Sequence, residues 1–262
     1  MPQLTRAEVT AVKRLTSGRV ELTLRCESLV GLAQPGQFVQ VAVGRELDPL
    51  LRRPYGFGPL FPEQNTFKLY VQAAGRGSEL LCAVEQGDEL DCLGPLGNPF
   101  PLPELGQRAC LVGGGTGLAP MVCLAQKLSE EGISALLLLG AGCCDELTGL
   151  ADVVEAGLEY ACATEDGSLG VQGFVTELLG VAEPADVYYA CGPTPMMLAV
   201  ARFAAEAGKP CWVSLEARMA CGYGVCASCA VPIGSPGAWE YRKACKDGPV
   251  FSAQEVVWDE LA

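Results

Sequence analysis

Four cysteines near the C-terminus have the spacing that points most directly to chemistry. Cys221, Cys226 and Cys229 follow the pattern Cys-x4-Cys-x2-Cys, and Cys245 comes after fifteen intervening residues. Plant-type 2Fe–2S clusters use this spacing of thiolate ligands. The two glycines between the first two cysteines allow a tight loop that turns backbone amides toward sulfur. A structural zinc site held by the same four thiolates is the alternative, although such sites more often read Cys-x2-Cys twice.

A glycine-rich segment, residues 113–120, predicts a nucleotide site. It lies between an expected strand and an expected helix, where glycines let a pyrophosphate approach the backbone and the helix N-terminus supplies N–H donors. It is not the Gly-x-Gly-x-x-Gly fingerprint, and a tight strand-to-helix turn is the alternative. Residues 140–145 contain no Arg or Lys to meet a ribose 2′-phosphate, which favours NAD over NADP. The residues expected to bind NAD here are Gly113, Gly114, Gly115, Thr116, Gly117 and Pro120.

Two shorter motifs in the first half of the chain predict a flavin site. An arginine can pair with a pyrophosphate through two hydrogen bonds, and an aromatic ring can stack on a flavin. Each motif alone is more often a simple turn. The residues concerned are Arg53, Pro54, Tyr55 and Gly56 in the first motif, and Gly75, Arg76, Gly77 and Ser78 in the second.

A fourth motif, Cys191, Gly192 and Pro193, follows an expected buried strand. Ligands of open α/β sheets bind at the carboxyl ends of such strands. We therefore expect these three residues beside the NAD site, whereas the two methionines that follow them belong to the core.

The segments between the motifs predict a multi-domain protein. Residues 1–103 contain short strands separated by glycine and proline, typical of a small antiparallel β-barrel. Residues 104–213 alternate strands and helices, which indicates an α/β domain with a parallel sheet. We expect helices there at residues 118–131, 146–155, 171–179 and 195–207. Residues 214–262 are expected to form a small loop-rich domain with little regular structure.

The composition excludes several functions. The chain has no histidine, so catalytic triads, histidine zinc sites and Rieske centres are excluded. A net charge of −13 argues against nucleic-acid binding, and no apolar run is long enough to span a membrane. The fourteen cysteines indicate a reducing, cytoplasmic setting. Nine of them, apart from the four ligands and Cys191, are expected to be buried packing residues.

In chain order these motifs resemble the ferredoxin–NADP reductase superfamily, whose marks are Arg-x-Tyr-Ser, Gly-Gly-Gly-x-Gly-x-x-Pro and Cys-Gly-Pro. The C-terminal part narrows the resemblance. Residues 214–229 and 245–251 are similar to the electron transfer subunits of NAD-dependent dihydroorotate dehydrogenases, as are residues 94–98 and 164–168. The resemblance covers nearly the whole chain.

The resemblance implies a role for each motif. Arg53 would contact the flavin phosphates, and Tyr55 would lie against the isoalloxazine ring. Residues 75–78 would hold the FAD pyrophosphate, residues 113–120 would line the NAD site, and residues 191–193 would face the nicotinamide. No residue is expected to act as an acid or base.

Gly56 departs from the family pattern. The family usually has a serine at this position, whose hydroxyl can reach flavin N5. We expect that hydrogen bond to come from the backbone or to be missing, which affects the tuning of the flavin and not its presence.

The implied function is electron transfer in pyrimidine biosynthesis. NAD exchanges a hydride and a 2Fe–2S cluster carries single electrons, so FAD must stand between them. The expected partner is an FMN-containing dihydroorotate dehydrogenase catalytic subunit, in a heterotetramer, because nothing in this chain resembles a dihydroorotate site. One alternative is a flavin subunit of an NADH–ferredoxin oxidoreductase or sulfhydrogenase. An alternative from another class is a non-enzymatic zinc scaffold.

Overall fold

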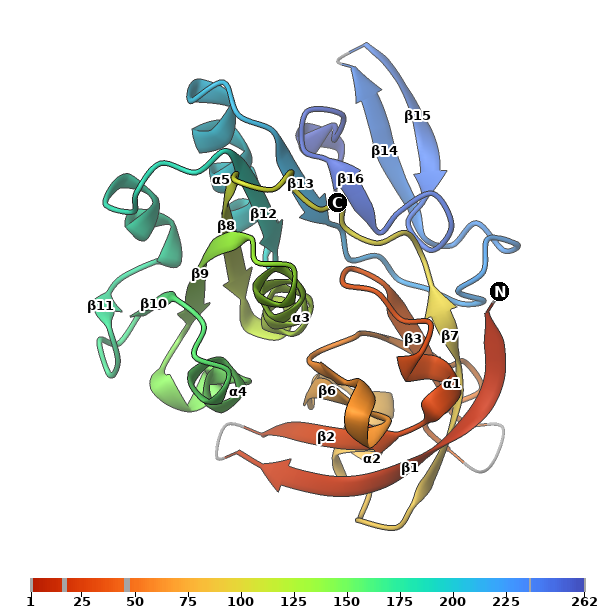
Figure 1. Cartoon of the computed structure of the whole chain (residues 1–262). Coiled ribbons are helices and arrows are strands. Elements are labelled where there is room, and N and C mark those ends of the chain that lie inside the picture. Colours follow the sequence, from red (N-terminus) through yellow and green to blue (C-terminus); the bar gives the residue numbers. More distant parts are fainter. Residues whose placement is uncertain (1, 16–17, 45–47, 236, 262) are drawn as a thin grey trace.

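A computed structural model describes residues 2–15, 18–44, 48–235 and 237–261. The first part of the chain forms a seven-stranded sheet in the order β4-β3-β7-β1-β2-β6-β5, with antiparallel pairing throughout. The sheet curls into a half-barrel (Figure 1). Its strands are β1 (Gln3–Arg14), β2 (Arg19–Arg25), β3 (Phe38–Val41), β4 (Arg53–Gly56), β5 (Leu60–Phe61), β6 (Thr66–Gln72) and β7 (Glu89–Leu96), with the short helices α1 (Glu27–Val30) and α2 (Arg76–Cys82).

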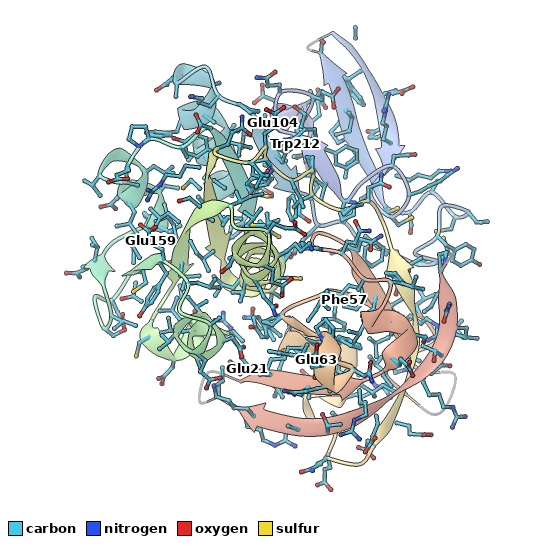
Figure 2. The ribbon with its side chains drawn as sticks, viewed as in Figure 1. Glu21, Phe57, Glu63, Glu104, Glu159 and Trp212 are labelled. Carbon is cyan, nitrogen blue, oxygen red and sulfur yellow. The ribbon has the colours of Figure 1, made fainter. Side chains whose placement is uncertain are left out.

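Alternation of residue types explains why the half-barrel curls around one face. In β7 the apolar Leu90 and Cys92 are buried while Glu89 and Asp91 are exposed, so a single face meets the core. At the centre of that core Phe57 is fully buried, with its ring 5.2 Å from Phe67 in an edge-to-face contact (Figure 2).

The middle of the chain forms a second seven-stranded sheet, in the order β11-β10-β9-β8-β12-β13-β16. All neighbouring pairs are parallel except β13 with β16. The predicted fold class, a β-barrel domain followed by a parallel α/β domain, is therefore confirmed. The strands are β8 (Arg108–Gly114), β9 (Ser134–Ala141), β10 (Tyr160–Thr164), β11 (Val171–Gln172), β12 (Val187–Cys191), β13 (Cys211–Ser214) and β16 (Val250–Ser252), and the helices are α3 (Leu118–Glu130), α4 (Leu150–Glu155) and α5 (Thr194–Glu206).

Both faces of the parallel sheet are covered, as its nearly continuous apolar strands require. Leu111 and Leu137 point to the face packed against α3 and α4, whereas Val112 and Leu138 point to the face packed against α5. Figure 1 shows α3 and α5 on opposite sides of the strands.

One predicted helix is wrong, and another begins later than predicted. Residues 171–179 form the short strand β11 and then a 3₁₀ helix, Val175–Gly180. Gly173 between them has φ +135°, which interrupts a helix. Helix α4 starts at Leu150 rather than at residue 146, since Gly149 before it has φ +82° and a Cβ there would lie 2.2 Å from the Tyr70 hydroxyl oxygen.

The C-terminal segment has more regular structure than predicted. Strands β14 (Ala230–Ser235) and β15 (Ala238–Lys243) form an antiparallel pair, and β16 joins the parallel sheet beside β13. The division into residues 1–103, 104–213 and 214–262 stays a prediction, because β16 ties the last of these segments to the second.

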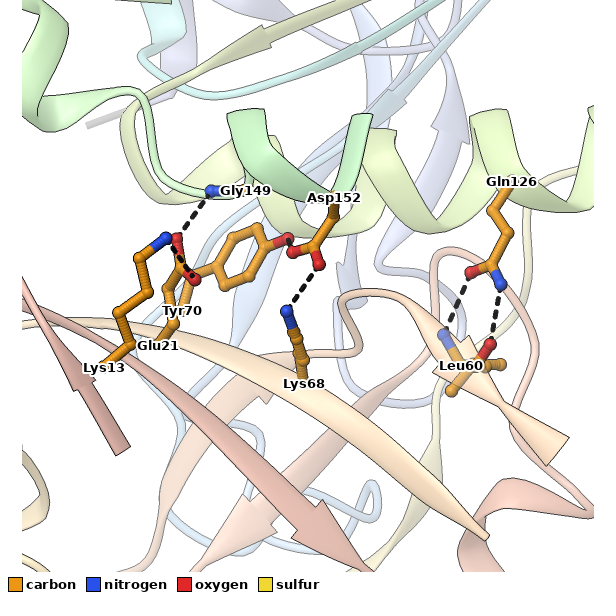
Figure 3. Close-up of polar contacts among 8 residues, drawn as sticks. All are labelled: Lys13, Glu21, Leu60, Lys68, Tyr70, Gln126, Gly149 and Asp152. Carbon is orange, nitrogen blue, oxygen red and sulfur yellow. Dashed lines mark hydrogen bonds and ion pairs between the residues drawn. The ribbon is translucent and has the colours of Figure 1, made fainter. Parts of the chain in front are cut away.

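The half-barrel and the parallel sheet meet through buried polar contacts (Figure 3). The Tyr70 hydroxyl donates to Asp152 Oδ2 at 2.9 Å, and Lys68 pairs with the other carboxylate oxygen. Nearby, the Gly149 amide donates to Glu21 Oε1 at 3.0 Å. These contacts join β2 and β6 to the start of α4, so they fix how the two sheets face each other.

All fourteen cysteines lie in the described part of the chain and are free thiols. Six of the nine predicted packing cysteines are buried. Cys82 and Cys143 are only half-buried and Cys144 is exposed, so the prediction is wrong for these three. None of the described helices combines the length and the apolar character that a membrane crossing needs.

Candidate functional site

The glycine-rich turn lies where the parallel sheet changes direction. Strands β8 and β12 are neighbours, yet the chain leaves β8 toward β9 on one side and leaves β12 toward β13 on the other. This is the topological switch point at which open α/β sheets bind ligands. A Cβ on Gly117 would lie 2.2 Å from the Cys191 carbonyl oxygen. The turn after β8 and the end of β12 are therefore in direct contact, and only glycine fits between them.

A cavity of about 840 Å³ opens at this switch point. Its charged lining consists of Arg19, Glu146, Glu165 and Glu216, and the side chain of Arg19 pairs with Glu146 at 3.3 Å. A cavity with three carboxylates and a single, already paired cation does not favour an added phosphate, in line with the prediction of NAD over NADP. The predicted residues that line it are Gly114, Gly115, Thr116, Gly192 and Pro193.

The remaining residues of the predicted NAD set lie elsewhere. Pro120 and Cys191 line a neighbouring cavity, and Gly117 separates the two strand ends. Gly113 is packed inward, because a Cβ there would lie 2.9 Å from Leu118 Cδ2.

The neighbouring cavity, of about 450 Å³, lies between the half-barrel and the parallel sheet. All four residues of the first flavin motif line it, from Arg53 to Gly56, but only Ser78 of the second motif does. Tyr70 and Gln72 of β6 complete the half-barrel side of the wall.

The two flavin motifs nevertheless touch. The guanidinium of Arg53 lies against Gly77, where a Cβ would come within 2.6 Å of Nε, and Arg53 Nη1 donates to the Leu51 carbonyl at 2.6 Å. Ser78 Oγ is used within its own turn, accepting from the Ala74 amide and donating to the Gly75 carbonyl, each at 2.9 Å.

Arg76 does not line the flavin cavity. It forms a surface ion pair with Asp48, in which both side chains are well exposed. The second motif is the start of helix α2, with Gly75 as the N-cap residue, and its Gly77 lies against the Arg53 guanidinium.

Tyr55 and Gly56 show what this wall offers to a ligand. Burial raises the pKa of Tyr55 to about 12, so its phenol stays neutral at any physiological pH. A Cβ on Gly56 would lie 3.5 Å from Pro120 Cδ, an ordinary contact. A Cβ therefore fits at this position, so the contact with Pro120 does not itself require glycine.

The two cavities share a wall, of which the sequence predicted only Thr116. Gln72, Thr116, Leu215 and Glu216 line both cavities. The Thr116 hydroxyl donates to Glu216 Oε1 at 3.5 Å, and desolvation beside the cavities raises the pKa of Glu216 despite this hydrogen bond and the partial exposure of the residue. The signal for Glu216 was its position in the stretch that resembles the family, while Gln72 has no local signal.

The four cysteines lie on one loop and on the segment packed against it. The Cys226 thiol receives hydrogen bonds from the Ser228 hydroxyl and amide, which lower its pKa to about 6. For Cys221 the amides of residues 223, 225 and 226 outweigh the effect of burial, and the pKa is lowered. Burial and the hydrogen bond with Cys229 raise the pKa of Cys245 to about 12.

The four thiols influence one another electrostatically in two pairs, Cys221 with Cys226 and Cys229 with Cys245, and Cys221 also acts on Cys245. Within the described ranges, no three Cys, Asp or Glu side chains are already gathered as a metal site. Four thiols with amide N–H groups directed at sulfur are nevertheless the donor set that an iron–sulfur cluster requires.

Comparisons with known proteins agree with this arrangement. Residues 216–257 match the family model of the iron-sulfur cluster binding domain of dihydroorotate dehydrogenase B. The chain is 40% identical over 257 residues to the dihydroorotate dehydrogenase B (NAD(+)) electron transfer subunit of Geobacillus thermodenitrificans (strain NG80-2), covering 96% of this chain and 98% of that protein. The chain belongs to the family of dihydroorotate dehydrogenase B electron transfer subunits.

Further relatives support membership of the family. The electron transfer subunit of Bacillus caldolyticus is 42% identical over 253 residues, covering 94% of this chain and 96% of that protein. Among solved structures, a chain of the NADH-dependent reduced ferredoxin–NADP oxidoreductase has a TM-score of 0.86 at 32% identity, covering 97% of this chain and 91% of that chain. The predicted resemblance to both the family and the reductase fold is confirmed.

Proposed function

We propose that this chain transfers electrons between NAD(+) and the catalytic subunit of a dihydroorotate dehydrogenase B, by way of FAD and a 2Fe–2S cluster. One observation carries the proposal, which is the order of the three sites. The cavity at the switch point shares a wall with the cavity of the flavin motif. Ala217 and Met219, which line that second cavity, lie four and two residues before Cys221. The three sites therefore follow one another in the order that electron transfer between NAD(+) and a cluster requires.

The protein's part in the chemistry is to bind and orient. Bound FAD supplies the exchange between the hydride of NADH and the single electrons of an iron–sulfur cluster. We assign Arg53 to the FAD phosphates, since its guanidinium is held in place by Gly77 and by the Leu51 carbonyl. Tyr55, neutral and half-buried, supplies the aromatic surface for the isoalloxazine, with Pro54, Gly56 and Ser78 around it.

We assign the cavity of 840 Å³ to NAD(+). Gly114 and Gly115 bring the backbone and the start of the following helix toward the pyrophosphate. Gly192 and Pro193 approach from β12, so the nicotinamide would lie where Thr116 and Glu216 separate the two cavities. Cys191 faces the flavin side of that wall, and burial keeps its thiol protonated.

The cluster ligands are Cys221, Cys226, Cys229 and Cys245 in this proposal. Support comes from the amides directed at the first two sulfurs and from the contact between the last two. No histidine exists in the chain to compete with thiolate.

We propose a catalytic partner that contains FMN and forms a heterotetramer with this chain in the cytoplasm. Tyr223 and Val225, two large apolar side chains of the cluster loop, are 55% and 74% exposed. They suit a docking surface that brings a partner's redox centre close to the cluster. Fourteen free thiols suit a reducing compartment.

The test is a comparison of the single chain with its complex. The purified chain should be coloured by flavin and iron, and NADH should bleach the flavin and give a reduced-cluster EPR signal. It should reduce an artificial acceptor with NADH yet not oxidise dihydroorotate until the catalytic subunit is added. Orotate formation by the single chain would contradict this division of roles. A colourless preparation that contains zinc would support the scaffold alternative, which the comparisons do not favour.

The identity of the partner distinguishes this proposal from the other alternative, a flavin subunit of an NADH–ferredoxin oxidoreductase or sulfhydrogenase. Co-purification with an FMN protein supports the present proposal. Co-purification with a large subunit that carries flavin and 4Fe–4S clusters would overturn it.

A further inference from the structure

Gln40 has a buried polar side chain that takes no part in the NAD, FAD or cluster sites described so far. It lies on β3 and is 0% exposed, yet neither Nε2 nor Oε1 has a hydrogen-bond partner among the described residues. A buried amide without a hydrogen-bond partner destabilises the folded state. In native proteins such a group usually bonds to a ligand or a water molecule. The side chain therefore indicates a missing partner.

The direction of the strand shows which way Gln40 points. Side chains alternate along β3, and Val39 and Val41 belong to the core of the half-barrel. Phe38 and Gln40 thus face the opposite way, and Phe38 lines the flavin cavity. Pro54, which pairs directly with Gln40 across the sheet, lines the same cavity.

On its other side the Gln40 amide touches the cluster loop. A Cβ on Gly222 would lie 2.5 Å from Gln40 Nε2 and 2.9 Å from its Cδ. Gly222 follows Cys221 directly and has φ +78°. The unpaired amide is therefore held between the wall of the flavin cavity and the residue next to the first cluster ligand.

We propose that Gln40 is a positioning residue for the cluster, whose side-chain N–H donates a hydrogen bond to the anionic sulfur on the Cys221 side. The inference rests on the proposed function, because it requires a cluster in this loop. Sulfur is an acceptor of the right charge that a cluster would bring to this loop, and it would give the amide the hydrogen bond that it lacks.

The bond has a predictable effect on electron transfer. Reduction adds negative charge to the cluster, so a donor aimed at sulfur stabilises the reduced form more than the oxidised form. Gln40 would then hold the reduction potential of the cluster above the value set by the four thiolates alone. It does so from the flavin side, where electrons enter or leave.

The test is the cluster midpoint potential of Gln40→Met in the holoprotein. Methionine fills a similar volume without a donor. We expect the equilibrium to shift about tenfold toward the oxidised cluster, which is a midpoint lower by ~59 mV for one electron. The matched control is Gln126→Met, which removes a half-buried amide bonded to Leu60 far from the loop and should leave the midpoint at the wild-type value. A Gln40→Met midpoint equal to that of the control would overturn the inference.

A second measurement does not depend on the variant retaining its cluster. Wild-type protein labelled with ¹⁵N only at glutamine side-chain amides should give a ¹⁵N coupling to the reduced cluster in pulsed EPR. The coupling should persist in Gln126→Met, and its absence from the wild type would overturn the inference. A wild-type chain with no reducible iron–sulfur signal would overturn the proposed function itself, which is a distinguishable result.

Discussion

The contact between the two sheets makes a quantitative prediction at Tyr70. Its hydroxyl donates to Asp152 at 2.9 Å, both residues are more than nine-tenths buried, and Lys68 also pairs with the carboxylate. Burial and the neighbouring carboxylate raise the pKa of Tyr70, so the phenol remains a donor throughout the physiological range. Tyr70→Phe removes this one donor and preserves the ring.

The loss of unfolding free energy in Tyr70→Phe depends on the interactions that Asp152 keeps. A hydrogen bond to a charged group contributes about 1.5–3 kcal/mol, and Asp152 keeps Lys68 as its counter-ion. We therefore expect a loss near the lower end, about 1.5–2 kcal/mol. For a domain of this size that corresponds to a melting temperature lower by roughly 3–8 °C.

A double-mutant cycle on the holoprotein tests the assignment. Asp152→Asn keeps the shape of the partner and lies outside the flavin cavity, so the cycle isolates the contact from any effect of Tyr70 on FAD. We expect a coupling free energy of about 1 kcal/mol or more between the two positions. Effects that add to within ~0.5 kcal/mol would refute the reasoning, since the two groups would then be energetically independent.

Three further predictions concern the cavities. Desolvation beside the two cavities raises the pKa of Glu216, although part of the residue is exposed, so its ionisation costs a small amount of stability as pH rises above the ordinary value of 4.5. Glu216→Gln should therefore melt slightly higher than wild type at pH 7–8, with the advantage disappearing toward pH 4.5, and a pH-independent difference would contradict this. Gly117→Ala should lower the free energy of unfolding by about 1–3 kcal/mol, because the added Cβ would collide with the Cys191 carbonyl oxygen. The control is Gly180→Ala, which should be close to neutral in the same thermal melts because space is open there. Arg53→Lys should weaken FAD binding about tenfold in a fluorescence titration of the flavin-free protein, because lysine lacks the planar fork; equal affinity would remove Arg53 from the phosphate site.

The sequence was most informative where chemistry imposes a local pattern. Cysteine spacing, the glycine-rich turn and the alternation of apolar strands each depend on neighbours in the chain, and they predicted the family, the fold class and the cofactors. The missed hairpin, β14 with β15, had such a signal on one side only, since apolar and polar residues alternate from Trp239 to Arg242 in β15 but not in β14.

The remainder depends on contacts between distant segments. The late start of α4 depends on a tertiary contact, that of Gly149 with Tyr70. The break at Gly173 had a local signal that the prediction missed, because a glycine inside an expected helix often marks an interruption. Gln40 is similar, because a glutamine in a strand has no distinctive pattern until the cluster loop is found beside it.

The pairing of β13 with β16 has a consequence for how this protein could be modified or could have arisen. Ser214 and Val250 are direct partners in that antiparallel ladder, so the cluster segment leaves and rejoins the sheet at adjacent points. A segment whose two ends lie about 5 Å apart can be exchanged for a short turn without separating the strands that hold it. The cluster segment therefore has the geometry of an interchangeable insert, and a two-cofactor reductase lacking it is a reachable design.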